Sequence, residues 1–366
     1  MSNGSKYYFP QLDAVRGLSF LAVYIYHVFH PEFGMGFFNG LLQYFYYNLS
    51  LSIDVFFILS SFLLTWLGIN EYKVKGNFSF INYFIRRILR IWPLYYLLMI
   101  FSFVLLPYVS ARLNVPVTLP PAYYYLFFIS NFYLEGHVYF LKFLWTLAVE
   151  EQFYLLWGIC LLFFQKRLVT CVAILIMASL CYSIYAILNN IRYEFNTLTF
   201  LFDFAIGIQA AILMHRQSSI VSFFRKISKR NNLLFILALP VMFIVNFCFI
   251  YNAPNSVLPF LDLLGRCLFI IFIGLFIIEQ MVNENSLIKL RSQRFLVYTG
   301  KISYGLYCFH GIVLTFGLVA LQKLNISLPV IIRGMLFLVI NYIVSAISYR
   351  FIERPFLHLK NKMRRI

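Results

Sequence analysis

The side chains that could do chemistry in this sequence are charged or imidazole groups inside long apolar segments. The first such segment contains Asp13, Arg16 and His27. Arg16 and His27 are eleven residues apart, so a helix would place them on one face, about 16 Å apart along its axis. Asp13 lies one turn before Arg16 and is a candidate ion-pair partner for it. Because charge is costly inside a bilayer, we expect these groups to face protein or a water-filled cavity.

Carboxylates occur at what should be a similar depth in two other apolar segments. Asp54 lies in the second, and the adjacent Glu150 and Glu151 lie in the fourth. A carboxylate beside an imidazole orients the ring and stabilises its protonated form, which is the arrangement of a general base. Neighbouring helix positions point about 100° apart, so at most one of the two glutamates can face His27. We predict a catalytic group of His27, Asp54, Glu150 and Glu151, and His30 is the alternative imidazole.

Arg87 and Arg90 lie three residues apart in the segment RRILRIWPLYY and should project from the same side of a helix. Two guanidinium groups in a fixed pair suit a pyrophosphate or a 3′-phosphate. A cationic anchor at the cytoplasmic surface would have the same spacing. Spacing alone therefore leaves both interpretations open, and both place the pair at a solvated surface.

Other intramembrane charges have local candidate partners. Asp262 and Arg266 are four residues apart, so we expect them to neutralise each other on one helix. His310 has two open interpretations, as a contact to the acceptor or as a buried hydrogen-bonding group. Glu353 is a candidate counter-ion for the arginine pair.

The composition requires a membrane protein to position these groups. The chain is 62% hydrophobic and only 12% charged, whereas soluble domains carry about 25% charged residues. The excess apolar surface must face lipid. We predict an all-α polytopic protein with one integral-membrane domain over residues 1–366 and a basic tail from about residue 354. The six cysteines lie in apolar runs without metal-ligand spacing, so we expect no metal site.

Ten apolar runs are long enough to span a bilayer. A further apolar stretch at 122–133 is too short, and its tyrosines suit the membrane interface. The predicted spans lie near residues 12–30, 48–70, 91–108, 147–165, 168–188, 197–215, 232–251, 261–282, 302–321 and 329–349.

The cations predict the orientation. Of the 30 Lys and Arg residues, 23 fall in one alternating set of connections and four in the other. The positive-inside rule then places both termini in the cytoplasm and requires an even number of spans. The net charge of +17 is not interpreted as nucleic-acid binding, because the cations cluster between apolar runs and form no continuous basic stripe.

Six segments together resemble the acyltransferase-3 family, integral membrane acyltransferases that modify bacterial surface glycans and some small molecules. Two positions depart from the family pattern. Ser61 stands where the family favours glycine, which should loosen a close helix contact, and Gly311 stands where many relatives have tryptophan. Both departures bear on substrate identity more than on reaction type. The six segments, in the family's order, are LDAVRGLSFLAVYIYHV, SIDVFFILSSFLLT, RRILRIWPLYYL, LWTLAVEEQFYLLW, GKISYGLYCFHG and SYRFIERPF.

The resemblance implies acetyl-CoA as the donor, bound from the cytoplasm, with His27 as the catalytic residue and Arg16, Arg87 and Arg90 needed for activity. We expect transfer of an acetyl group to a hydroxyl of a surface glycan, such as O-antigen, capsule or a lipid-linked precursor. Direct transfer and an acetyl-His27 intermediate both remain open. The expected location is the bacterial cytoplasmic (inner) membrane, and the expected partners are acetyl-CoA, the glycan and membrane lipids.

Two alternatives remain. One is acylation of a small hydroxylated molecule such as a macrolide. The other is a glycan flippase or transporter, which would also need polar groups inside the membrane. A transporter would not need an arginine pair that faces the coenzyme pool.

Overall fold

The structure is a computed structural model that describes residues 8–29, 35–113, 117–133 and 138–363. His30 lies outside these described residues. The described part is helical and contains no strand, as the sequence predicts.

The helices form two compact units that alternate along the chain. The first unit comprises Met1–Asn70, Arg167–Tyr193 and Leu198–Lys301. The second comprises Glu71–Lys166, Glu194–Thr197 and Ile302–Ile366. The expectation of one domain over the whole chain stays a prediction.

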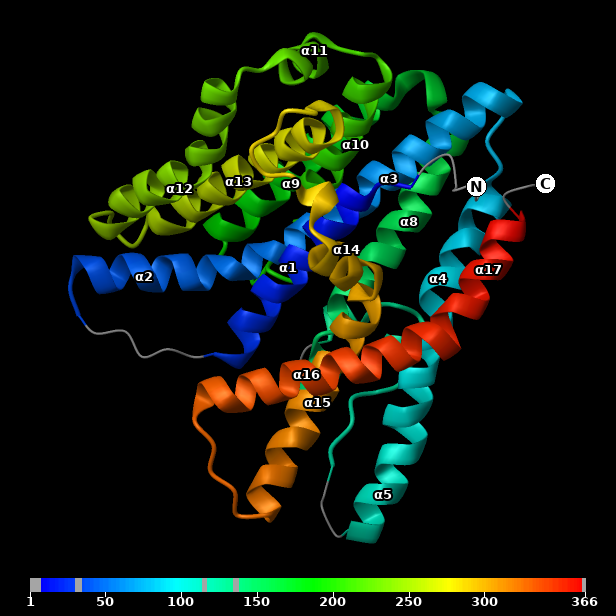
Figure 1. Ribbon diagram of the computed structural model, residues 1–366, viewed down its shortest axis with the longest axis vertical. Coiled ribbons are helices and arrows are strands. Elements are labelled where there is room, and N and C mark those ends of the chain that lie inside the picture. Colours follow the sequence, from blue (N-terminus) through cyan, green and yellow to red (C-terminus); the bar gives the residue numbers. More distant parts are fainter. Residues whose placement is uncertain (1–7, 30–34, 114–116, 134–137, 364–366) are drawn as a thin grey trace. The chain divides into compact units, whose positions relative to one another are not determined.

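In the first unit, helices α12 and α13 lie side by side (Figure 1). Ser228 caps the start of α12 by accepting a hydrogen bond from the backbone N–H of Asn231 at 3.2 Å. The helices of this unit are α1 (Pro10–Val28), α2 (Phe37–Tyr47), η1 (Asn48–Leu51), α3 (Ser52–Lys75, which belongs to this unit as far as Asn70), η4 (Gln165–Arg167, of which Arg167 belongs to this unit), α9 (Leu168–Leu188), α10 (Leu201–His215), α11 (Ser219–Lys226), α12 (Lys229–Tyr251), α13 (Leu258–Val282), η5 (Leu290–Ser292) and α14 (Arg294–Lys301).

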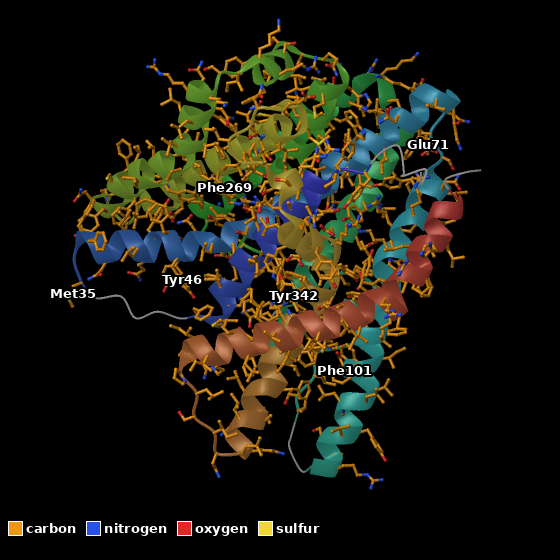
Figure 2. The ribbon with its side chains drawn as sticks, viewed as in Figure 1. Met35, Tyr46, Glu71, Phe101, Phe269 and Tyr342 are labelled. Carbon is orange, nitrogen blue, oxygen red and sulfur yellow. The ribbon has the colours of Figure 1, made fainter. Side chains whose placement is uncertain are left out.

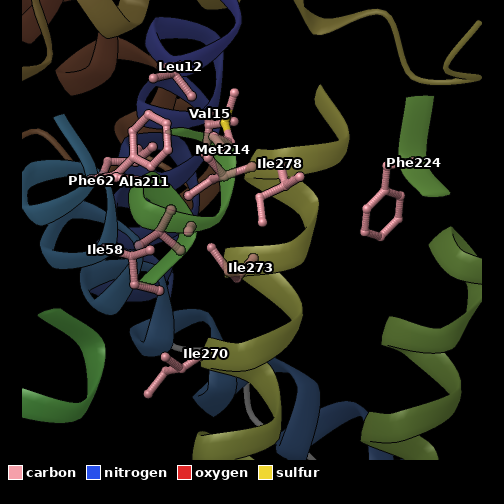
Figure 3. Packing of buried hydrophobic residues seen from close by; sticks show 14 of the residues in the cluster. Leu12, Val15, Ile58, Phe62, Ala211, Met214, Phe224, Ile270, Ile273 and Ile278 are labelled. Carbon is pink, nitrogen blue, oxygen red and sulfur yellow. The ribbon is translucent and has the colours of Figure 1, made fainter. Parts of the chain in front are cut away.

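The core of the first unit joins α1, α3, α10 and α13 (Figure 3). Leu12, Ile58 and Ile270 are at most 1% exposed, and each comes from a different one of these helices. Lipid tails are as apolar as these side chains, so close van der Waals packing holds such helices together. This packing fixes α1, which carries three of the polar residues singled out above.

In the second unit, α15 and α16 are joined by a short connection and pack against each other (Figure 1). Ser79 caps α4 by accepting a hydrogen bond from the backbone N–H of Asn82 at 3.3 Å. The helices are α4 (Phe80–Ile100), η2 (Phe101–Leu105), α5 (Leu106–Leu113), α6 (Tyr123–Leu126), η3 (Ser130–Phe132), α7 (Tyr139–Lys142), α8 (Trp145–Phe163), α15 (Ser303–Lys323), α16 (Val330–Ser348), η6 (Tyr349–Glu353) and α17 (Arg354–Met363).

Eight helical segments in the described part are long and apolar enough to cross a membrane, which makes this a multi-pass membrane protein. All ten predicted spans coincide with helices, but α1 and α10 are not among the eight. Polar residues lower the hydropathy of α1, and α10 has only 15 residues. The count of ten spans and the orientation of the termini therefore stay predictions. The stretch at 122–133 forms only the short α6 and η3.

Candidate active site

Helix α1 carries Arg16 and His27 on one continuous helix, as the spacing predicts. Arg16 is 7% exposed, and its Nη1 lies 3.5 Å from Oδ1 of Asp13. The predicted Asp13–Arg16 pair is therefore confirmed. His27 is half-buried in the last turn of the helix, which ends at Val28. A buried guanidinium and an imidazole thus lie about three turns apart along one helix.

Two glycines let α1 and α14 meet backbone to backbone beside Arg16. A Cβ atom on Gly17 would lie 2.4 Å from the carbonyl oxygen of Leu296. A Cβ atom on Gly300 would lie 1.7 Å from the carbonyl oxygen of Asp13. Neither position can hold a larger residue without moving a backbone, so α14 positions the turn of α1 that carries the ion pair.

Asp54 belongs to a buried charge cluster in the first unit. Its Oδ2 accepts from Nε of Arg266 at 3.0 Å, and Nη2 of Arg266 also donates to Oδ2 of Asp203 at 2.5 Å. The side chains of Asp54 and Asp203 are 5% and 0% exposed. The sequence predicts Asp54 near His27, and the structure shows Arg266 as its partner. The catalytic role of Asp54 stays a prediction.

The expectation that Asp262 neutralises Arg266 is wrong. Asp262 is exposed on the same helix, whereas the guanidinium of Arg266 reaches α3 and α10. Its Nη1 also donates to the carbonyl of Thr199 at 3.4 Å, and its Cζ lies 5.0 Å from the ring centre of Phe200. Two buried carboxylates attract the guanidinium more strongly than one solvated carboxylate does.

In the second unit, Arg87 is buried and does not lie on the solvated surface that the sequence predicts. It is 5% exposed, and its Cζ lies 5.9 Å from the ring centre of Tyr154 on α8. Tyr83, one turn earlier on α4, donates from its hydroxyl to the carbonyl of Tyr154 at 3.0 Å. These aromatic rings bury Arg87. Its Nε has no acceptor among the described residues, so donor capacity remains for a ligand.

Arg90 is half-buried and interacts electrostatically with Glu353 of η6. The interaction involves Arg90 and not Arg87, so the role of Glu353 as a counter-ion for the whole arginine pair stays a prediction. The carboxylate of Glu353 also lies 3.4 Å from the hydroxyl of Ser348 and packs against Gly305. Arg87 and Arg90 therefore have different surroundings.

The adjacent glutamates of α8 differ in burial and in hydrogen-bond partners, as expected for side chains that point about 100° apart on a helix. Glu151 is 6% exposed, and Nε1 of Trp92 donates to its Oε2 at 3.5 Å. Its Oε1 has no partner in the described part of the chain. Glu150 is half-buried and accepts from the hydroxyl of Tyr154 at 2.7 Å. His27 belongs to the other unit, so its predicted proximity to either glutamate stays a prediction.

Sequence reasoning missed a buried polar cluster around His310. The hydroxyl of Thr146 donates to that of Tyr307, which donates to the carbonyl of Phe143, both at 2.8 Å. His310 is 0% exposed, and its Nδ1 contacts the carbonyl of Tyr307. The interpretation of His310 as a buried hydrogen-bonding group therefore fits the structure. The i,i+3 spacing of Tyr307 and His310 in the sequence could have indicated that these two side chains lie on the same side of one helix.

The two departures from the family pattern both lie at close contacts. A Cβ on Gly311 would lie 2.9 Å from Cα of Phe140, so a larger residue here would push α7 away from α15. A Cβ on Gly207 would lie 2.1 Å from Oγ of Ser61, which shows that α3 and α10 meet closely at that serine. The expected loosening at Ser61 is wrong, because the partner helix supplies the glycine.

A family profile described as an acyltransferase domain matches residues 9–350, nearly the whole chain. The chain belongs to the acyltransferase-3 family. This acyltransferase domain covers the first five motif segments in full and the start of the sixth, SYRFIERPF, which continues to Phe356. Within the described residues, no group of three or more His, Cys, Asp or Glu side chains is placed to hold a metal ion.

Curated relatives match along almost all of this acyltransferase domain. The protein YrhL of Bacillus subtilis (strain 168), whose name assigns it provisionally as a peptidoglycan O-acetyltransferase, is 29% identical over 376 residues, or 95% of this chain and 55% of that protein. The peptidoglycan O-acetyltransferase OatA of Listeria monocytogenes is 28% identical over 377 residues, or 96% of this chain and 56% of OatA. The chain thus spans little more than half the length of these relatives. No solved structure gave a significant match.

Proposed function

We propose that this acyltransferase transfers an acetyl group from acetyl-CoA to a hydroxyl of a cell-wall glycan at the bacterial cytoplasmic membrane. Family membership supports acyl transfer. The names of the relatives favour peptidoglycan as the acceptor over O-antigen or capsule. The observation that carries the proposal is the pairing of a buried Arg16 with a half-buried His27 on one helix inside the matched region.

His27 supplies the proton chemistry in this proposal. Its imidazole takes the proton of the glycan hydroxyl as that oxygen attacks the thioester carbon. The tetrahedral intermediate then collapses, the carbon–sulfur bond breaks, and the departing thiolate takes the proton from the imidazolium. The products are the acetyl ester and free coenzyme A. A second route, in which the imidazole first carries the acetyl group, gives the same products.

The arginines supply recognition of the donor. The guanidinium of Arg87 is held against Tyr154 and retains a donor in Nε that no described residue uses. Arg90 lies one turn further along the same helix. Forked guanidinium groups bind phosphate oxygens in pairs, so these residues fit the phosphates of a coenzyme.

The test uses the full chain purified in lipid nanodiscs, with acetyl-labelled acetyl-CoA and soluble peptidoglycan fragments. We expect label to appear as an ester on the glycan and coenzyme A thiol to be released in equal amount. His27→Ala should lose both by roughly 10²- to 10⁴-fold. Label on the glycan with a normal rate in His27→Ala would overturn the role of the imidazole. Absence of transfer to peptidoglycan, with transfer to a small hydroxylated acceptor, would overturn the proposed acceptor.

A further inference from the structure

The end of α1 that carries His27 is held by a tyrosine from α2. The hydroxyl of Tyr46 lies 2.8 Å from the carbonyl oxygen of Tyr26 and also contacts the carbonyl oxygen of Phe29. These carbonyls flank His27 in the chain. The last four carbonyls of a helix lack helical donors, and that of Tyr26 is one of the last four in α1. Tyr46 thus supplies a donor to the final turn of α1.

The rings form a second connection between the two helices. The ring of Tyr26 lies 5.7 Å from that of Tyr46 and 5.2 Å from the imidazole of His27, the latter edge to face. Tyr46 therefore reaches the histidine's turn through its hydroxyl and, by way of Tyr26, through its ring.

Helix α2, on which Figure 2 labels Tyr46, is itself held by α12. The hydroxyl of Tyr44 accepts from Nδ2 of Asn246 at 2.6 Å. The ring of Tyr44 also lies 5.6 Å from that of Phe247. Because α12 anchors α2, the hydroxyl of Tyr46 has a fixed position from which to hold α1.

We propose that Tyr46 is a positioning residue that fixes the orientation of His27 for acetyl transfer. This inference rests on the proposed function. Sequence reasoning gave the orienting role to a carboxylate, but Asp54 in this unit is held by Arg266. Small displacements of a catalytic group slow a reaction strongly because the reacting atoms must be aligned. Tyr46 acts through the backbone on each side of His27, which restrains the turn that carries the imidazole.

The test removes one hydroxyl at a time from α2. In Tyr46→Phe we expect kcat for acetyl transfer to fall roughly three- to tenfold, the change for one hydrogen bond, with the KM for acetyl-CoA unchanged. Tyr47→Phe is the matched control, because it removes the hydroxyl of an exposed tyrosine from the same helix, one that takes no part in holding α1 or α12 in this argument. It should leave kcat close to wild type. An equal fall of kcat in both variants would mean a general loosening of α2 and would overturn the proposal.

A double-mutant cycle tests whether Tyr46 acts through His27. Single-turnover rates are measured for wild type, His27→Ala, Tyr46→Phe and the double variant. If Tyr46 positions the imidazole, Tyr46→Phe should change nothing further once His27 is alanine. This inference would be overturned if Tyr46→Phe slowed transfer by the same factor in wild type and in His27→Ala, or if Tyr46→Phe had a normal rate. In either case the activity of the wild-type protein would still support the proposed function. Inactive wild-type protein would instead overturn the proposed function, and this inference with it.

Discussion

Nη2 of Arg266 lies 2.5 Å from Oδ2 of Asp203, although the two residues are 63 positions apart. The same guanidinium holds Asp54, 212 positions away, at 3.0 Å. One cation therefore links three helices, α3, α10 and α13, inside the first unit. Oδ1 of Asp203 has no partner among the described residues, so the guanidinium is the main compensation for this buried charge.

We predict that Arg266→Met strongly destabilises the protein. Removing one member of a buried ion pair leaves a charge without compensation, which typically costs about 3–5 kcal/mol. Here two buried carboxylates would lose their cation. Thermal unfolding in detergent, followed by circular dichroism or a thiol-reactive dye, should show a clear fall in Tm.

Asp262→Asn is the matched control for this prediction. Asp262 is exposed and forms no ion pair with Arg266 among the described residues. This change should therefore alter the free energy of unfolding by no more than about 0.5 kcal/mol, as an ordinary surface substitution does, and leave Tm close to wild type. A larger fall of Tm in Asp262→Asn than in Asp203→Asn would support the local Asp262–Arg266 pair that the sequence suggests.

The Arg266 cluster shows where reasoning from sequence ends. Spacing identifies partners within one helix, and it found the Asp13–Arg16 pair. It cannot identify a partner 63 or 212 residues away, because that depends on which helices pack together. The same limit hid Tyr46, one of 27 tyrosines, whose contacts with α1 depend on how α2 packs.

Hydropathy predicted the long helices well because each needs a continuous apolar run. The short α2, α11, α14 and α17 were missed, since eight to eleven residues give no span-length signal. The burial of Arg87 was also missed. A cationic segment beside a span is usually a solvated anchor, and only the aromatic cover from α8 shows otherwise.

A second prediction concerns the glycine contact beside Arg16. Gly300→Ala should lower Tm and acetyl transfer together, because its Cβ would need the space that the carbonyl of Asp13 occupies, at 1.7 Å. Backbone must move to relieve this overlap, and overpacking of this kind typically costs about 1–3 kcal/mol. Thermal unfolding and the transfer assay measure the two effects.

Gly40→Ala provides the comparison within the same unit. Its Cβ would meet the ring of Phe247 at 3.3 Å, a contact that a small side-chain shift can relieve. Its Tm should stay closer to wild type. If Gly300→Ala were as stable and active as Gly40→Ala, the close approach of α1 and α14 would not position Arg16.

A third prediction concerns topology. The end of α11 carries Arg225 and Lys226 and the start of α12 carries Lys229 and Arg230, whereas residues 252–257 at the other end of α12 carry no cation. The positive-inside rule therefore places the start of α12 in the cytoplasm. Reporter fusions at Lys229 and at the C-terminus should report cytoplasm, and a fusion at Asn255 should report the outside. An external C-terminus would contradict the even number of spans.

The last prediction is that Arg87→Lys weakens acetyl-CoA binding while the protein remains folded. Lysine keeps the charge and much of the buried stem, but it loses the planar fork and the Nε donor that no described residue uses. A lost hydrogen bond to a charged group costs about 1.5–3 kcal/mol, which corresponds to a Kd raised roughly tenfold or more. Arg86→Lys is the matched control in the same motif, because Nη2 of Arg86 already binds Oε2 of Glu71 at 2.8 Å. Equilibrium binding of labelled acetyl-CoA to nanodisc-embedded protein measures both constants, and Tm confirms folding. Equal affinity in Arg87→Lys and wild type, or an equal loss in Arg86→Lys, would return this segment to the role of a membrane anchor.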